Sequence, residues 1–188
     1  MKLKKLSLIA LSLLTVGCTG DAKTISIPPL PPIEPELKMV CEGCSYNEQT
    51  TVDFLFDRGI VEPRAMSVVL GNIKQESLFK PNICEGGARV PYEKCHRGGY
   101  GLIQWTTTAR YDGLGHFAAS YGGNPSELKT QLRYMVNEKQ WTDIEPYFIK
   151  GGLSSKQYMG LAYDWLGWGV MGKRGIYADQ YLDRLKIV

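Results

Sequence analysis

The chain has 188 residues, 44% of them hydrophobic, which is enough for one domain of ordinary size with a hydrophobic core and an additional segment. Its formal charge of +3 comes from 22 Lys and Arg against 19 Asp and Glu, and three of those lysines lie within the first five residues. Without these three the two totals balance, so the domain lacks the basic surface that binds nucleic acid, and we exclude DNA and RNA as partners.

The first residues are typical of an export signal. Three lysines precede an apolar run, Leu6–Val16, which is shorter than the roughly 20 residues that a membrane-spanning helix needs. Gly17 and Cys18 follow as in the lipobox of bacterial lipoproteins, although Thr15 occupies a position where that motif usually has leucine. We therefore expect a signal peptide at 1–17 and a lipid on Cys18. The alternatives are ordinary cleavage nearby or retention of the segment as an anchor, and all three place the domain outside the cytoplasm.

The segment 18–40 is predicted to be a linker that begins with the lipid-bearing cysteine. It contains five prolines between Pro28 and Pro35, which exclude a helix or a central strand and favour an extended polyproline conformation. A stiff spacer after a lipid anchor would hold a domain at a set distance from a membrane, and the alternative is a leader without a spacing role. The folded domain is then 41–188, exported to the periplasm or the outer surface and attached to a membrane through its N-terminal segment.

Four cysteines remain for the domain: Cys41, Cys44, Cys84 and Cys95. In an exported chain an even number of cysteines indicates disulfides, and four allow three pairings. Cys84 and Cys95 flank a ten-residue loop, so a disulfide between them would brace one wall of a cleft. The alternatives are a four-thiolate zinc site and a redox-active CxxC at Cys41 and Cys44. We expect disulfides, and neither a metal nor another cofactor.

From residue 41 onward, apolar periodicity and helix-capping residues predict a mainly helical domain. Asn47 and Asn124 are suited to cap the predicted helices that begin there. Pro63 is suited to the first turn of the helix 62–77, and Pro125 to the first turn of the helix 124–141. The predicted helices span 47–59, 62–77, 104–123, 124–141, 154–166 and 173–187. Pro81–Gly101 holds five glycines and is predicted to be an insert, either irregular or a β-hairpin. The fold class is therefore mainly α, with a small α+β character from the insert.

The carboxylate of Glu76 stands out within the predicted helix 62–77. Counted from Met66, apolar residues recur at i+3 and i+7 and Glu76 falls at i+10, so it continues the face that is expected to be buried. Pro81 places it near the helix end, at the negative pole of the helix dipole. Burial and the dipole both disfavour a charged carboxylate, and a carboxyl group that keeps its proton is what a general acid requires. The alternative is a surface glutamate paired with a lysine such as Lys80.

Two motifs lie in order around the insert. The segment "GNIKQES", Gly71–Ser77, is followed by "GYGLIQW", Gly99–Trp105, and by "AR" at 109–110. This pair resembles phage-tail-type lysozymes of the lysozyme superfamily and, more distantly, the "ES … GLMQ" pattern of soluble lytic transglycosylases. The resemblance is strong over 65–110 and continues weakly through "QLRYM", Gln131–Met135, and the final "KRGIYADQYL". It implies a lysozyme-like fold in which helices and the insert line a cleft.

The resemblance also implies site residues, with Glu76 as the catalytic acid. The substrate-binding residues would be Ser77 beside the acid, Gly101 in the turn opposite, Gln104 with its amide in the cleft, and Tyr100 and Trp105 with rings that can stack on a sugar. Glycine lets a backbone approach a sugar closely, and an amide can hydrogen-bond N-acetyl groups or hydroxyls. For Trp105 the alternative is an aromatic residue of the core.

The predicted function is a muramidase that cuts peptidoglycan between N-acetylmuramic acid and N-acetylglucosamine, as a lysis or wall-opening enzyme of a phage or prophage. Spacing does not identify a second carboxylate, and the candidates are Glu85, Glu93, Asp112 and Asp164. Superfamily members with a single glutamate form anhydro ends instead, as lytic transglycosylases. A tyrosine segment of those enzymes is faintly similar to Leu161–Trp165, in which Tyr163 would be a cleft residue or, alternatively, part of the core.

Other functional classes stay open as alternatives. A thiol peptidase would need a cysteine–histidine pair, for which Cys95 and His96 are neighbours in the sequence, and a zinc amidase would need more histidines than His96 and His116. A non-enzymatic wall-binding or virion structural protein is the third alternative. We expect peptidoglycan as the partner, and a monomer unless the chain is part of a virion.

Overall fold

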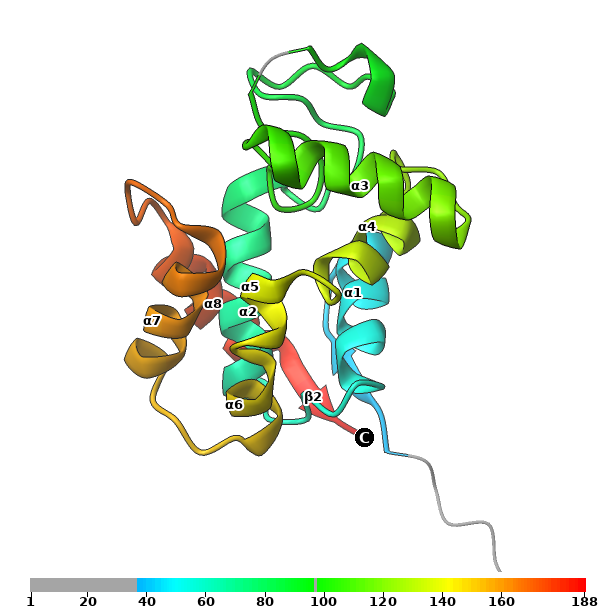
Figure 1. Ribbon diagram of the computed structural model, residues 1–188. Helices are drawn as coiled ribbons and strands as arrows, with labels where there is room; N and C mark the ends of the chain where they lie inside the picture. Colours follow the sequence, from blue (N-terminus) through cyan, green and yellow to red (C-terminus); the bar gives the residue numbers. More distant parts are fainter. Residues whose placement is uncertain (1–36, 97) are drawn as a thin grey trace, which may run out of the picture. The chain divides into compact units, whose positions relative to one another are not determined.

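The computed structural model describes residues 37–96 and 98–188 (Figure 1). The predicted signal peptide, Cys18 and most of the linker lie outside the described residues. In chain order the elements are β1 (Met39–Cys41), α1 (Tyr46–Phe56), α2 (Pro63–Ser77), the 3-10 helix η1 (Tyr92–Lys94), α3 (Thr108–Tyr121), α4 (Leu128–Met135), α5 (Lys139–Thr142), α6 (Glu145–Lys150), α7 (Ser155–Leu166), α8 (Arg174–Arg184) and β2 (Leu185–Ile187). The fold is mainly α, as predicted, and β1 pairs antiparallel with β2 in a small sheet.

Helix α2 lies at the centre of the domain, with ten of its 15 residues buried. It packs against α1, α7 and α8 (Figure 1). Gly71 lies where α2 meets α8, and a Cβ atom at this position would stand 2.6 Å from the backbone nitrogen of Ala178. Glycine therefore allows the two helices to approach closely. Helix α2 ends at Ser77, because Leu78 adopts a left-handed conformation with φ of 52° and turns the chain into the insert.

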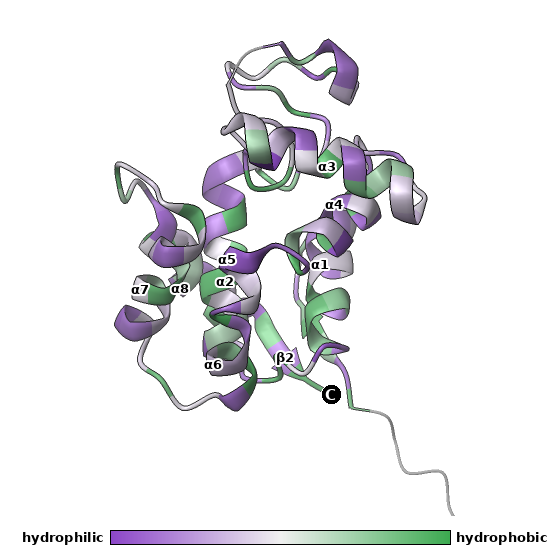
Figure 2. Cartoon of the chain, in the orientation of Figure 1, coloured by the Kyte–Doolittle hydropathy of each residue, from purple (hydrophilic) through white to green (hydrophobic). Residues whose placement is uncertain are grey.

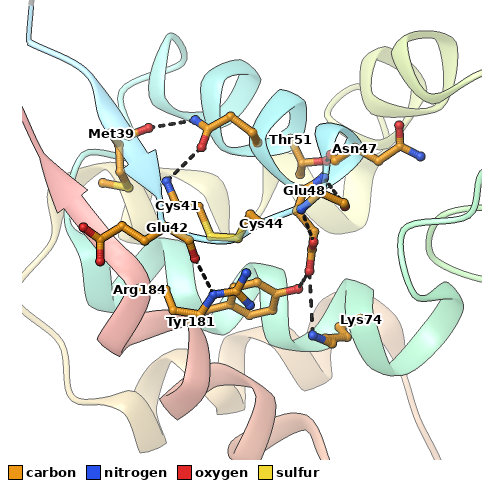
Figure 3. The surroundings of a disulfide bond; sticks show 12 residues. Met39, Cys41, Glu42, Cys44, Asn47, Glu48, Thr51, Lys74, Tyr181 and Arg184 are labelled. Carbon is orange, nitrogen blue, oxygen red and sulfur yellow. Dashed lines mark hydrogen bonds and ion pairs between the residues drawn. A yellow bond between two sulfur atoms is a disulfide. The ribbon is translucent and has the colours of Figure 1, made fainter.

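The disulfide Cys41–Cys44 joins β1 to the start of α1 (Figure 3). Ser45 is the N-cap of α1 and forms a capping box with Glu48. Burial alone would raise the pKa of the Glu48 carboxyl, but hydrogen bonds from Tyr181 and Ser45 and the charge of Lys74 outweigh burial, so the pKa is lowered. Because Lys74 is on α2 and Tyr181 on α8, this network ties three helices together (Figure 3).

Helix α1 begins earlier than predicted. Ser45, not Asn47, is its cap, and the Asn47 side chain instead donates a hydrogen bond of 2.9 Å to the carbonyl of Phe79. Further upstream, Met39 is buried and pairs with β2. The folded unit therefore includes the last residues of the segment 18–40 that composition assigned to the linker.

The predicted helix 124–141 is wrong, because the structure contains α4 and α5 with a break between them. Asn124 does not cap a helix, since its side-chain oxygen accepts a hydrogen bond from the nitrogen of Ser126 in a turn. At the break, Glu138 turns its carboxylate toward Arg110 on α3, with 2.7 Å between Oε1 and Nε. This contact joins residues 28 apart in the sequence, so local periodicity could not predict it.

Two other helices are shorter than predicted. The helix expected over 104–123 begins at Thr108, after the N-cap Thr107, and the helix expected over 173–187 ends at Arg184 and continues as β2. Across the described ranges, 37–96 and 98–188, no helix has the length and apolar character that crossing a membrane requires.

The insert between α2 and α3 is irregular rather than a β-hairpin. Its strand-like pairing consists of isolated bridges, among them Cys84 with Tyr100 and Tyr100 with Trp105. The disulfide Cys84–Cys95 closes the insert, with 5.6 Å between the two Cα atoms. The short helix η1 carries hydrophilic residues (Figure 2). The chain returns to the end of α2 where the Ser77 hydroxyl donates to the carbonyl of Leu102 at 2.7 Å.

Candidate active site

Glu76 lies in the last turn of α2, where the chain leaves the helix for the insert. Its side chain is 17% exposed. One of its oxygens, Oε1, accepts a hydrogen bond from Nη2 of Arg174, the first residue of α8, and the two side chains form an ion pair. The carboxylate is thus neither free in solvent nor enclosed among apolar groups.

The loop between α7 and α8 holds the guanidinium of Arg174 in place. Nη1 donates hydrogen bonds to the carbonyls of Val170 and Met171, at 2.9 and 3.0 Å. The guanidinium carbon lies 4.5 Å from the ring centre of Trp168, at a distance that suits a cation–π interaction. Among the described residues, the buried Nε of Arg174 has no hydrogen-bond partner. The orientation of this cation toward Glu76 is therefore set by backbone carbonyls and one indole ring.

The same loop is fastened to the end of α2 beside Glu76. The side-chain oxygen of Gln75 accepts a hydrogen bond of 2.8 Å from the nitrogen of Lys173. At Gly172, which has φ of 58°, a Cβ atom would stand 2.9 Å from the Gln75 amide carbon. Glycine at this position therefore lets the loop lie against α2.

The sequence-based picture of the environment of Glu76 needs a correction. An apolar environment was expected around Glu76, whereas its side chain forms an ion pair with the guanidinium of Arg174. The two residues are 98 positions apart, so helical periodicity alone gives no sign of the pairing. The alternative partner, Lys80, is not the one that the structure shows.

Ser77 and the turn after the insert fix the backbone next to Glu76. The hydroxyl of Ser77 donates to the carbonyl of Leu102 at 2.7 Å, and the Gln131 side-chain oxygen accepts from the Leu102 nitrogen at 2.7 Å. Gly101 has φ of 74°, and a Cβ atom there would stand 2.5 Å from the Gln131 amide nitrogen. Ser77 follows the acid in the chain, and Ser77 and Gly101 are both engaged in shaping this turn.

Gln104 also directs its amide group back onto the turn. Its Nε2 donates to the carbonyls of Gly101 and Ile83, at 3.0 and 3.4 Å. The backbone of Gln104 is left-handed, with φ of 52°, which is uncommon for a residue with a side chain. A Cβ atom on Gly99 would stand 2.9 Å from the Gln104 side-chain oxygen, so that oxygen lies over the glycine backbone.

Tyr100 and Trp105 were predicted as rings that stack on a sugar, and this is wrong because both side chains are fully buried. The Tyr100 hydroxyl lies 2.9 Å from the hydroxyl oxygen of Ser126, and the Trp105 indole nitrogen donates to Glu138 at 2.9 Å. Both rings belong to the core that supports the insert, which is the alternative weighed for Trp105.

Exposed aromatic side chains occur instead at the junction of α7 and its following loop. Tyr163, for which a core position was an alternative, is 51% exposed. Its ring meets that of Trp168 edge to face, with 5.3 Å between centres and 83° between planes. Sequence reasoning missed Trp168 and the role of Arg174. The available signals were a tryptophan between glycines in "LGWGVMGKR" and the arginine of "KRGIYADQYL".

The four cysteines of the domain form two disulfides, Cys41–Cys44 and Cys84–Cys95. A cysteine in a disulfide supplies neither a thiolate ligand nor a nucleophile, so the four-thiolate zinc site and the Cys95 peptidase do not fit this structure. Among the described residues there is no group of three or more His, Cys, Asp or Glu that could hold a metal ion.

The candidates for a second carboxylate are all exposed: Glu85, Glu93, Asp112 and Asp164. Only Glu85 among them accepts a hydrogen bond from the backbone that carries the second motif, at 3.0 Å from the Gly99 nitrogen. None is held against Glu76 by a described contact, so Glu76 and Arg174 are the charged pair at this end of α2.

The chain was compared with models of protein families. The model of a family described as phage tail lysozyme matches residues 46–183 of the chain. The match extends from the first residue of α1 almost to the end of α8. It therefore includes Glu76, the turn at 101–104, the loop that carries Trp168, and Arg174.

Proposed function

The chain belongs to the phage tail lysozyme family, and from this we propose that it cleaves the glycan strands of peptidoglycan as a muramidase with Glu76 as its general acid. The family match supports a lysozyme-like enzyme that acts on the cell wall. The assignment of the reaction and of Glu76 rests on the chemistry of the site.

One observation carries the proposal: Glu76 is a partly buried carboxylate that the protein has only partly hydrogen-bonded. In the part of the chain that the structure describes, Arg174 is the side chain that binds it, and it binds through one oxygen, Oε1. Within residues 37–96 and 98–188 the other oxygen, Oε2, accepts no hydrogen bond and is not fully buried, so a ligand can reach it. A structural carboxylate at this level of burial normally has its hydrogen-bonding capacity filled by the protein.

In this proposal Glu76 transfers its proton to the glycosidic oxygen, and the bond from that oxygen to C1 of N-acetylmuramic acid breaks. Water, or a hydroxyl of the same sugar, then forms the new bond to C1 and gives its proton to the Glu76 carboxylate, which restores the acid. The guanidinium of Arg174 hydrogen-bonds one oxygen of the Glu76 carboxyl group. Arg174 acts as a positioning residue, because it fixes the orientation of the carboxyl plane.

Product analysis on purified peptidoglycan tests the reaction. A muramidase releases new reducing ends at N-acetylmuramic acid, a transglycosylase releases anhydro ends, and a peptidase or amidase releases free amines. We expect reducing ends from the wild-type protein and none from Glu76→Gln, which retains the side-chain shape and lacks the acid. Anhydro ends would assign the alternative of transglycosylation to the same residue, and free amines would contradict the proposal.

The N-terminal segment supports a proposal about where the protein is located in the cell. Residues 1–17 direct export, Cys18 carries the lipid, the chain from there to residue 36 is a spacer, and the domain from residue 37 onward acts at a membrane that faces the wall. The two disulfides support an oxidising compartment. Palmitate labelling of the full chain in bacteria, compared with Cys18→Ser, tests the anchor, and equal labelling of both would contradict it.

A further inference from the structure

We propose that Trp168, together with Tyr163, forms a glycan-binding subsite next to Glu76, which takes an N-acetylhexosamine unit of a β-1,4-linked strand. This inference rests on the proposed function, because it assigns a position to the strand that Glu76 would cleave. The subsite would lie in the loop between α7 and α8, which is outside the two motifs around the insert.

The first argument is position. The indole of Trp168 lies 4.5 Å from the guanidinium of Arg174, and that guanidinium is hydrogen-bonded to Glu76. One guanidinium group therefore separates the ring from the carboxylate. A strand whose glycosidic oxygen lies at Glu76 brings the adjacent sugar within reach of this ring.

The second argument is exposure. The chain contains four tryptophans, and three of them, Trp105, Trp141 and Trp165, are fully buried. Trp168 alone is partly exposed, and Tyr163 beside it is 51% exposed. Exposed aromatic rings in contact with each other form an apolar surface of the kind that marks a binding site.

The third argument is that the rings are already held in place. Arg174 lies over one side of Trp168, and Tyr163 meets it edge to face at 83°. Tyr163 is on the rigid helix α7, and Arg174 is tied to Val170 and Met171 by hydrogen bonds. Rings whose rotamers are fixed before binding lose little entropy when a ligand packs on them.

The chemistry favours a sugar over a lipid surface as the occupant. A pyranose presents a face of C–H groups that packs on an aromatic ring, and hydroxyls that hydrogen-bond at its rim. The cation that packs on Trp168 is buried and paired with Glu76, so it does not present its charge to a membrane, but the same loop exposes Val170, Met171 and Lys173. Lipid binding is therefore treated as an outcome of the test.

The experiment uses the fluorescence of Trp168 in the Glu76→Gln protein, which binds strands without cutting them. Because the other tryptophans are buried, acrylamide quenches mainly Trp168. We expect tetra-N-acetylchitotetraose and soluble peptidoglycan strands to reduce this quenching, and Trp168→Phe to remove the quenchable emission. Tyr163→Ala in the same background should raise the Kd about tenfold. The matched control is Tyr147→Ala, because Tyr147 on α6 is 52% exposed, and it should leave the Kd unchanged.

The outcomes separate this inference from the proposed function. If strands bind without protecting Trp168 and Tyr163→Ala binds as tightly as Tyr147→Ala, the subsite is overturned, while wild-type cleavage would still support the muramidase. If Trp168 is protected but wild type releases no reducing or anhydro ends, the subsite stands and the proposed reaction fails. Protection by vesicles of anionic lipid and not by strands, or no strand binding at all, would also overturn the subsite.

Discussion

Glu138 and Glu76 each face an arginine in a site with little solvent, yet the two regions treat the carboxylate differently. Between α4 and α5, Arg110 donates to both oxygens of Glu138, at 2.7 and 2.8 Å, and Trp105 adds a third hydrogen bond at 2.9 Å. The side chain of Glu138 is 4% exposed. At the end of α2, Arg174 binds one oxygen of Glu76, whose side chain is 17% exposed.

The difference separates a carboxylate that holds the fold from one that is available for chemistry. Glu138 has donors on both oxygens and fixes the break between two helices to α3, so it has no capacity left for a ligand. Among the residues that the structure describes, Glu76 accepts through one oxygen, and the Nε of its arginine has no hydrogen-bond partner. Burial and an arginine partner are common to both sites, so the count of hydrogen bonds is the feature that distinguishes them.

The largest effect should come from Glu76→Gln. We expect kcat/KM for peptidoglycan cleavage to fall about 10³-fold, because the proton donor is lost. The free energy of unfolding should fall by about 1–2 kcal/mol, because the buried Arg174 loses a charged partner that it binds through one oxygen. Turbidity loss of wall suspensions and urea unfolding measure the two quantities. Undiminished cleavage by this variant would remove Glu76 from the mechanism.

The reverse pattern is expected for Glu138→Gln. This change leaves Arg110 without its charged partner in a partly buried site, so the free energy of unfolding should fall by about 3 kcal/mol. The folded fraction should keep its activity, which is checked by assaying at a temperature where the variant is fully folded. If Glu138→Gln were stable but inactive, Glu138 would serve catalysis rather than stability, which would contradict the comparison.

Gly71→Ala should affect the Glu76 region without touching the Glu138 region. The added methyl group would stand 2.8 Å from the Arg174 carbonyl and 2.6 Å from the Ala178 nitrogen, so α8 must shift away from α2. We expect a loss of about 2 kcal/mol in stability and a loss of activity, because Arg174 moves with α8. Urea unfolding and wall cleavage measure these two losses.

The control for this change is Gly160→Ala on α7, where an added methyl group meets nothing within 4 Å. It should stabilise the protein by about 0.5–1 kcal/mol through the higher helix propensity of alanine, with cleavage unchanged. Equal destabilisation by both substitutions would mean that close packing at Gly71 is not the cause.

The placement of Glu76 could be predicted from sequence because it depends on local regularity. The apolar stripe of α2, the proline at its start and the chain reversal after it all lie within about one motif, and the structure has helix α2 where the pattern predicted it. The same locality explains the failures at helix ends. Asn47 and Asn124 are good capping residues by type, but each is used for a different hydrogen bond.

The rest of the site depends on contacts between distant segments. Arg174 binds Glu76 although the two are 98 residues apart in the sequence. Trp168 is connected to Glu76 through Arg174, so its place in the site could not be predicted without that contact. Tyr100 and Trp105 lie in a motif that was read as sugar-facing, yet the irregular insert turns both rings inward. A motif identifies which residues belong together, but the direction of each side chain is decided by packing that the motif does not contain.

The smallest expected effect is a loss of stability at alkaline pH, which arises in the Glu138 region through Tyr134. Burial, and then the charge of Glu138, raise the pKa of Tyr134 to about 12 from 10.0. Because the folded pKa is the higher one, the contribution of Tyr134 to stability is complete below pH 10 and is lost as the pH rises toward 12. Partial solvent screening limits this loss to about 1 kcal/mol near pH 11. Tyr134→Phe should reduce the decline in unfolding free energy between about pH 9 and about pH 11, measured by urea titration at each pH. If the unfolding free energy of Tyr134→Phe declined as much as that of the wild type, ionisation of Tyr134 beside Glu138 would not be the cause of the decline.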